Sequence, residues 1–207
     1  MYALVEDGSI TKYFSGNRGI TLGSNQYPQA IFTLWTKSER EAIGIYEVVF
    51  DDSNKRDEAY YNNTNQSFDY ADGQVTASYG TATPKQLEDR NETNNDGSPM
   101  LDADGNQVVT KGLKSQKKQI IKNQASGLLA PTDWYVIKAT DVAEYSVPSA
   151  VSTFRADVRT KSNEMETAID NASDVDALKA LYEYVNTGTE ENPVMERPLG
   201  EFPTLEI

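Results

Sequence analysis

The spacing of the apolar residues changes partway along this chain of 207 residues. Over residues 1–83, apolar and polar residues alternate in short runs rich in β-branched and aromatic side chains, which is typical of strands. From residue 113 onward, the apolar residues recur every three or four positions, as in helices. We therefore predict an α+β chain: a small β-rich module at 1–83, an acidic linker with a β-hairpin at 84–110, and a three-helix region with an extended tail at 111–207.

Two Asp-Gly pairs indicate turns within the β-rich module. Asp7-Gly8 separates the runs 2–5 and 9–13, and Asp72-Gly73 lies inside the aromatic segment 60–79. Asp-Gly favours the two-residue turns that join the strands of a hairpin. We therefore expect a hairpin at the first pair and a tight turn at the second.

Between the two turns, the sequence predicts one strand and one short helix. The run 45–50 is the clearest strand of the chain, because it is almost wholly apolar and β-branched or aromatic. The stretch 35–43 predicts a helix that Ser38 caps and Gly44 ends.

Residues 84–106 break the pattern. They are acidic and rich in asparagine, and they contain the sequence Asp102-Ala103-Asp104-Gly105-Asn106. We interpret them as a surface linker with one small hairpin, whose arms are 99–101 and 107–110.

The region that follows predicts helices over 113–129, 148–172 and 173–187, and then an extended tail with spaced prolines. The first helix is expected to stop at Pro131, and Pro148 suits the first turn of the second. The apolar residues expected to face a core are Leu113, Ile120, Ile121, Ala125 and Leu128 in the first helix, Val151, Phe154, Val158, Met165 and Ile169 in the second, and Val175, Leu178, Leu181, Tyr182 and Val185 in the third.

Trp134 follows the first helix closely, and its large apolar ring is expected to pack against other apolar side chains. Phe154 and Val158 would supply that surface, because they lie one turn apart on the second helix. In the structural interpretation, Trp134 fastens the first helix to the second. In the functional interpretation, this region binds a partner.

Two arginines accompany these apolar residues. Arg155 and Arg159 lie four positions apart on the second helix and therefore point the same way. Either could pair with Asp133. The alternative is that both are exposed and bind an acidic or C-terminal segment of a partner.

An acidic chain carries one basic helical face. The formal net charge is −13, from 19 basic and 32 acidic residues, yet no acidic residue occurs between Gly105 and Thr132. The lysines of this stretch are Lys111, Lys114, Lys117, Lys118 and Lys122. They form either a solvated helix face or an interface with an acidic partner, which could be another copy of the chain.

The overall charge argues against nucleic acid and anionic membranes as partners, since both attract cationic surfaces. No aromatic residue lies between these lysines for base stacking. No apolar run approaches the ~18 residues that a membrane-spanning helix needs. We therefore expect neither nucleic-acid binding nor membrane insertion.

The residue types exclude several chemistries. The chain has no cysteine and no histidine, so thiolate nucleophiles, histidine bases and the usual zinc ligands are excluded. Residues 102–106 resemble a calcium loop only superficially, because Leu113 stands where an EF-hand needs a bidentate glutamate. No phosphate-binding loop or nucleophile elbow occurs. We expect no enzyme, no cofactor and no metal site.

The segment 60–79 mixes aromatic residues with amides and carboxylates. Its aromatic residues are Tyr60, Tyr61, Phe68, Tyr70 and Tyr79. Together they could form a sugar-binding platform, but a small sheet with inward-facing aromatic residues explains the same pattern.

Two resemblances point to a biological setting. The series Leu128-Leu129, Thr132-Asp133-Trp134 and Phe154-Arg155-Ala156-Asp157-Val158-Arg159 resembles the C-terminal module of bacteriophage tail assembly chaperones and tail-fibre-associated proteins. Residues 1–8, Lys12-Tyr13 and 44–49 are similar to a β-rich module at the start of many phage tail-associated proteins. Together the resemblances cover about 1–83 and 113–160.

The chain departs from that family pattern by its segment 84–110 and by a further helix and tail, which suit a protein that stays in the particle. The resemblance implies a virion structural protein of the tail or baseplate, which attaches or connects tail fibres by protein–protein binding. It would lie in the virion tail, and in the host cytoplasm during assembly.

The alternatives are a tail-fibre assembly chaperone and a receptor- or glycan-binding module. The expected partners are other tail or fibre proteins, and a homo-oligomer is possible. Lys111, Lys114, Lys117, Lys118, Lys122, Trp134, Arg155 and Arg159 are the candidate partner-binding residues.

Overall fold

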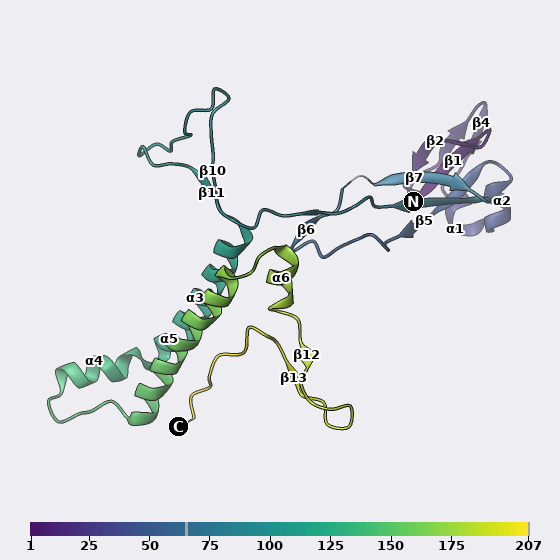
Figure 1. Ribbon diagram of the computed structural model, residues 1–207. Coiled ribbons are helices and arrows are strands. Elements are labelled where there is room, and N and C mark those ends of the chain that lie inside the picture. Colours follow the sequence, from purple (N-terminus) through teal and green to yellow (C-terminus); the bar gives the residue numbers. More distant parts are fainter. Residues whose placement is uncertain (65, 207) are drawn as a thin grey trace. The chain divides into compact units, whose positions relative to one another are not determined.

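The computed structural model describes residues 1–64 and 66–206 and confirms the α+β class (Figure 1). The chain divides into two compact units, residues 1–83 and residues 84–207. The first is built mainly of strands, and the second contains the long helices.

A five-stranded sheet forms the first unit, in the order β2-β1-β5-β8-β7. Its strands are β1 (Tyr2–Glu6), β2 (Ser9–Phe14), β5 (Ile45–Asp51), β7 (Ser67–Ala71) and β8 (Gln74–Ser78). All neighbours are antiparallel except β5 and β8, which run parallel. The strand expected at 45–50 is thus confirmed, and it lies in the middle of the sheet.

Both Asp-Gly pairs form hairpin turns, as the sequence predicts. Asp7 and Gly8 join β1 to β2 with φ values of 49° and 77°, and Asp72 and Gly73 join β7 to β8 with φ values of 51° and 74°. Two consecutive positive φ angles define the turn whose twist matches that of the strands. Asp and Gly are among the residues that adopt this conformation most readily.

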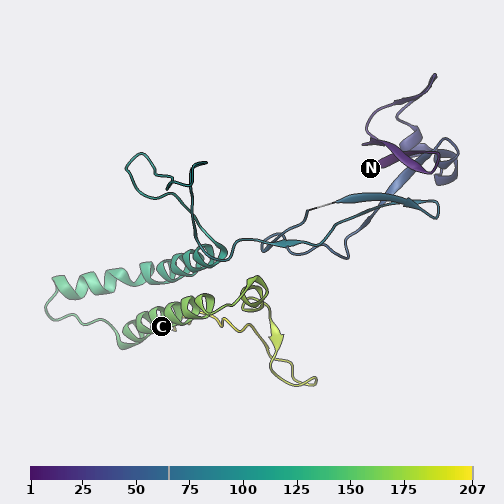
Figure 2. The same ribbon diagram turned by 45° about the horizontal axis from the view of Figure 1, so that its top comes forward.

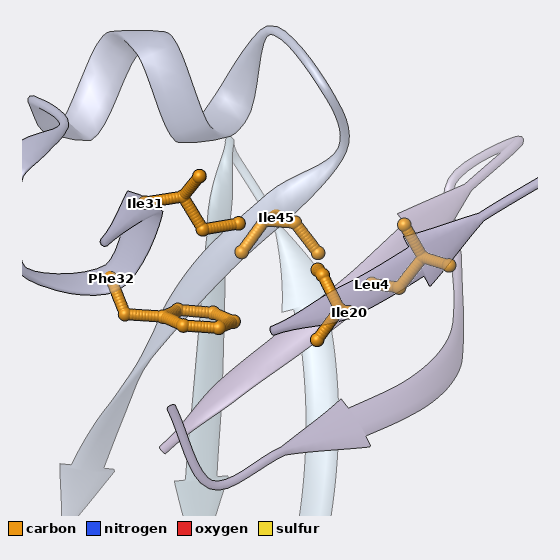
Figure 3. Close-up of a cluster of buried hydrophobic side chains, with 5 residues drawn as sticks. All are labelled: Leu4, Ile20, Ile31, Phe32 and Ile45. Atoms are coloured by element: carbon orange, nitrogen blue, oxygen red, sulfur yellow. The ribbon is translucent and has the colours of Figure 1, made fainter. Parts of the chain in front are cut away.

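One face of the sheet is covered by a small hairpin and two short helices. These are β3 (Ile20–Leu22), β4 (Asn25–Tyr27), α1 (Ile31–Leu34) and α2 (Lys37–Glu41). Figure 3 shows how their apolar side chains meet those of β1 and β5. The residues of this cluster are Leu4, Ile20, Ile31, Phe32 and Ile45.

The short helix expected over 35–43 is confirmed as α2, but it is shorter, and α1 before it was not predicted. Thr36, not Ser38, caps α2: its hydroxyl accepts a hydrogen bond from the Glu39 N–H at 3.3 Å, and the Glu39 carboxylate accepts one from the Thr36 N–H at 2.7 Å. This reciprocal capping box satisfies two free donors at once. It fixes the helix start two residues earlier than a Ser38 cap would.

The other face of the sheet holds a second apolar cluster. Its buried members are Ala3, Val48, Val75 and Ala77. Around them, aromatic rings pack in pairs: Tyr13 of β2 lies 4.8 Å from Phe68 of β7, and Tyr46 lies 4.9 Å from Tyr70, centroid to centroid. The Tyr13–Phe68 pair joins the two edge strands, so the sheet curls towards closure. Near the end of the unit, β6 (Tyr61–Asn62) pairs with β9 (Thr83–Pro84).

The second unit begins with an irregular β-arm. Its strands β10 (Arg90–Asn91) and β11 (Val109–Thr110) pair antiparallel, and a bridge joins Leu101 to Gln107 farther along the arm. Of the expected hairpin with arms 99–101 and 107–110, the pairing of Leu101 with Gln107 is confirmed, whereas Val109 and Thr110 pair with Asn91 and Arg90 instead. The side-chain amide of Gln107 donates to the carbonyl oxygens of Glu92, at 2.7 Å, and of Val108, at 2.9 Å, and so ties the arm together.

Helix α3 (Leu113–Leu129) has the expected bounds, but Pro131 does not stop the helical path. A 3-10 turn, η1 (Ala130–Thr132), contains the proline, and α4 (Asp133–Asp141) follows it. The expected end of the first helix before Pro131 is therefore confirmed, whereas the omission of α4 is wrong. Proline lacks an N–H and fits the start of a new helical segment, so the chain continues through it.

Helix α5 (Ser149–Asp170) packs along α3 (Figures 1 and 2). Its expected core residues Val151, Phe154, Val158, Met165 and Ile169 are all buried. On α3, Leu113, Ile121 and Ala125 are buried as expected, but Ile120 is exposed. A position next to Ile121 lies about 100° around the helix and cannot share its face fully.

The expected helix over 173–187 is too long. Helix α6 (Val175–Ala180) begins at Asp174, whose carboxylate accepts from the Ala177 N–H at 2.8 Å. Beyond it, Val185 belongs to β12 (Val185–Asn186), which pairs with β13 (Met195–Glu196). The tail is therefore a hairpin followed by an extended segment. None of the helices in the described residues is both long and apolar enough to cross a bilayer.

Candidate protein-binding surface

Helix α4 is apolar, short and uncovered. It has nine residues, and none of them is buried. The side chains of Trp134 and Ile137 are 49% and 61% exposed, and Val136 and Val142 are also exposed. A helix of this length is marginal in water without tertiary packing, and adjacent large apolar residues on a surface often mark an interaction site.

Arg155 of α5 holds the start of α4 in place. Its guanidinium donates to the Asp133 carboxylate at 2.7 Å, to the Leu129 carbonyl oxygen at 3.1 Å and to the Thr132 hydroxyl. The Thr132 hydroxyl in turn donates to the Leu129 carbonyl at 2.7 Å. One guanidinium nitrogen, Nη1, thus binds the end of α3, the 3-10 turn and the first residue of α4. The expected pairing of Arg155 with Asp133 is confirmed.

Trp134 does not cover Phe154 and Val158, so that expectation is wrong. Its ring packs on Tyr135, with centroids 3.8 Å apart, and the Lys138 ammonium lies 5.9 Å from it. Because the helix continues past Pro131, Trp134 is carried along α4 instead of turning back over α5. Phe154 and Val158 are packed instead by Ala125, Leu128, Leu129, Phe202 and Leu205.

Arg159 has a different environment from Arg155. It is exposed, and its guanidinium donates to the Arg155 backbone carbonyl at 3.0 Å. The two arginines therefore share a helix face but not a role. Arg155 is a structural clamp, whereas Arg159 lies at the surface.

The five lysines each have a partner within the second unit. Lys111 pairs with Asp89 at 2.8 Å, Lys114 with Glu88 at 2.5 Å, Lys118 with Asp170 at 2.6 Å and Lys122 with Glu166 at 3.3 Å, and Lys117 lies 4.7 Å from the centre of the Tyr182 ring. Lys114 is buried and also donates to the Asp170 backbone carbonyl at 2.9 Å. The basic face thus lies along the seams of α3 with α5 and with the segment before α3. That these lysines also bind a partner stays a prediction.

These ion pairs shift two pKa values. The hydrogen bond to Asp170 raises the pKa of Lys118. The hydrogen bonds from Lys111 and the Gly112 N–H lower the pKa of Asp89 to about 2. Both shifts stabilise the charged forms, so each pair is fully ionised near neutral pH.

The aromatic residues of the segment 60–79 do not form one exposed platform. Tyr60 and Tyr61 are buried, and Phe68 and Tyr70 pack in the cluster on the sheet. In the acidic turn, the Asp102 carboxylate accepts from the backbone N–H groups of Asp104, at 3.0 Å, and Asn106, at 2.8 Å. The described residues contain no group of three or more acidic side chains placed to hold a metal ion.

A second apolar surface lies on the hairpin of β12 and β13, where the sequence predicted a helix and tail. Val185, Val194 and Met195 are exposed there, and Tyr184 and Arg197 help to line a cavity beside the hairpin. The β-forming residues Tyr184 and Val185, followed closely by Gly188, are the signal that could have predicted a strand and turn here.

Comparisons of the chain with protein-family models, with curated proteins and with solved structures found no match.

Proposed function

We propose that this chain is a non-enzymatic structural protein of a bacteriophage tail or baseplate, which attaches or connects tail fibres by protein–protein binding. The observation that carries the binding role is α4, whose Trp134, Val136 and Ile137 are exposed together on a helix with no buried residue. The tail setting rests on the resemblance of residues 1–83 and 113–160 to phage tail-associated proteins. In this setting the chain lies in the virion, and in the host cytoplasm during assembly.

The partner of α4 is a tail or fibre protein with an apolar surface that is neutral or basic at its rim. The chain as a whole has a net charge of −13, and Asp141 and Glu144 follow the apolar residues of α4. An acidic partner would be repelled at long range by the net charge of the chain and at short range by these two carboxylates. Binding would cover the exposed side chains and add the tertiary packing that a nine-residue helix lacks.

Mass spectrometry of washed virions from the phage that encodes the chain tests the structural role. We expect the chain in purified particles at a fixed ratio to the other tail proteins. Its absence from complete particles would overturn the structural role. The assembly-chaperone alternative, which the same exposed apolar helix favours, would then take its place.

A pull-down with the fibre and tail proteins of the same phage tests the surface itself. We expect Ile137→Ser to reduce capture, because it places a hydroxyl in the apolar contact. Leu34→Ser is the matched control, since Leu34 is 79% exposed and belongs to the other unit. Equal capture by the two variants would exclude α4 as the binding surface.

A further inference from the structure

The end of the described chain forms an extended segment that we call the C-terminal strap, residues 200–206. It follows Leu199, which is 2% exposed and donates its N–H to the Leu181 carbonyl oxygen at 3.0 Å. Gly200 then turns the chain with a φ of 73°. Leu199 is therefore a fixed anchor, and Gly200 is the natural hinge after it.

The strap packs on an apolar cluster where α3 meets α5, and we call this surface the groove. Phe202 and Leu205 pack against this cluster, whose buried members are Ala125 of α3 and Phe154 and Val158 of α5. Residues 203–206 of the strap line a cavity together with α5, and the strap runs beside α5 in both views (Figures 1 and 2). Leu128 and Leu129 of α3 cover part of the same cluster, and the strap adds the apolar contacts of Phe202 and Leu205 to it.

The strap is held mainly by these side chains. Phe202 and Leu205 are half-buried, and within the described part of the chain no backbone N–H of residues 201–206 donates to another backbone group. The main polar contacts are at its start, where Glu201 pairs with Arg197 and accepts from the Tyr184 hydroxyl at 2.6 Å. A segment without a backbone ladder can leave its groove with few bonds broken.

We propose that the C-terminal strap exchanges between copies of this chain, so that Phe202 and Leu205 of one copy fill the groove between α3 and α5 of a second copy. The molecule itself supplies the occupant, because every copy carries a segment that already fits this groove. An exchanged strap makes the same contacts as the strap in place, so exchange costs little contact energy and its extent is set by the hinge and by concentration. The exchange would link copies whatever the biological role of the chain.

Charge sets the conditions for exchange. Each copy has a net charge of −13, so two copies repel one another at low ionic strength. Salt screens this repulsion over a Debye length of about 10 Å at 0.1 M and about 3 Å at 1 M. The apolar contacts of Phe202 and Leu205 are not weakened by salt. Exchange should therefore increase with both protein concentration and salt.

Engineered disulfides can test this directly, because the chain has no cysteine of its own. Thr153 of α5 and Thr204 of the strap line the same cavity of about 350 Å³. Three full-length variants are needed: Thr153→Cys, Thr204→Cys labelled with a heavy isotope, and the double variant in one chain. The two single variants are mixed and oxidised, and mass spectrometry identifies which chains are joined.

We expect the double variant to close within one chain when dilute. In the mixture, we expect the disulfide between position 153 of one copy and position 204 of another to exceed both disulfides between identical variants. It should rise with concentration and salt, and it should be lost when Phe202→Ser and Leu205→Ser are added to the strap donor. If the mixed disulfide does not exceed the other two, or if the double variant does not close, the exchange is overturned.

Discussion

The carboxylate of Asp89 accepts a hydrogen bond from the backbone N–H of Gly112 at 2.9 Å, although 23 positions separate the two residues. The carbonyl oxygens of Gln86 and Leu87 accept from the next two N–H groups of α3, at 2.9 and 3.1 Å. The first turn of a helix has N–H groups without partners inside the helix. In this chain a distant segment supplies the partners that a local cap would normally provide.

The Asp89 contact makes stability depend on pH. Its pKa is lowered from 3.8 to about 2 by Lys111 and by the Gly112 N–H, so the folded state favours the charged form. The added stability is present above pH 3.8 and is lost as the pH falls towards 2. We expect Asp89→Asn to lower the free energy of unfolding at pH 7, and this deficit to shrink as the pH falls. Urea titrations across that range measure it, with Asp104→Asn as the exposed control.

Gly112 allows the chain to pass close to α3. A Cβ at this position would meet the backbone of Leu87 and Glu88. We expect Gly112→Ala to destabilise the protein by about 1–3 kcal/mol, as overpacking does elsewhere. Gly127 lies within α3, and a Cβ there would have no neighbouring atom within 4 Å. Gly127→Ala should therefore stabilise the protein by up to about 1 kcal/mol. Denaturant unfolding of the two variants should shift in opposite directions, and a shift in the same direction would contradict the packing described.

Trp134 and Phe154 should respond differently to truncation. Phe154 is buried in the contact of α3 with α5, so Phe154→Ala should cost about 3–5 kcal/mol. Trp134 is half exposed, so Trp134→Ala should change stability by less than about 1 kcal/mol. Circular dichroism during denaturation measures both without relying on tryptophan fluorescence. A large loss in Trp134→Ala would place that ring in a core.

Arg155 should determine how well the helical structure of α4 is maintained. The bonds of Arg155 to Asp133, Leu129 and Thr132 all come from its Nη1 nitrogen, and a lysine side chain is one bond too short to place its ammonium there. We expect Arg155→Lys to lower the hydrogen-exchange protection of residues 133–141 by about 1 kcal/mol, a value reduced for the exposure of Asp133. The Arg159→Lys variant is the control on the same helix face. Equal protection in the two variants would show that the clamp is dispensable.

Sequence patterns predicted the elements that are decided locally. The two Asp-Gly turns fix their hairpins because few residues adopt two consecutive positive φ angles. The repeat from Val151 to Ile169 predicts the buried face of α5 because its helix packs along one neighbour for most of its length. The α+β class followed from the same two kinds of pattern.

The remaining features depend on contacts between distant residues. Whether Trp134 turns back over α5 depends on whether the helical path continues past Pro131, and the clamp from Arg155 favours continuation. Helix α6 is shorter than its apolar spacing suggests, and the Leu181 carbonyl after it bonds to the returning Leu199. The lysine partners could not be predicted either, since Asp89 and Asp170 lie far from α3 in the sequence.

The order of the segments along the chain also determines which contacts can form first during protein synthesis. The residues that cap α3 are made before that helix, so its first turn can close as soon as it leaves the ribosome. The groove between α3 and α5 is complete at about Val158, but Leu205 is added roughly 50 residues later, which takes about 3–10 s at typical translation rates. During this interval, a nascent chain presents an open apolar groove to whatever segment reaches it first.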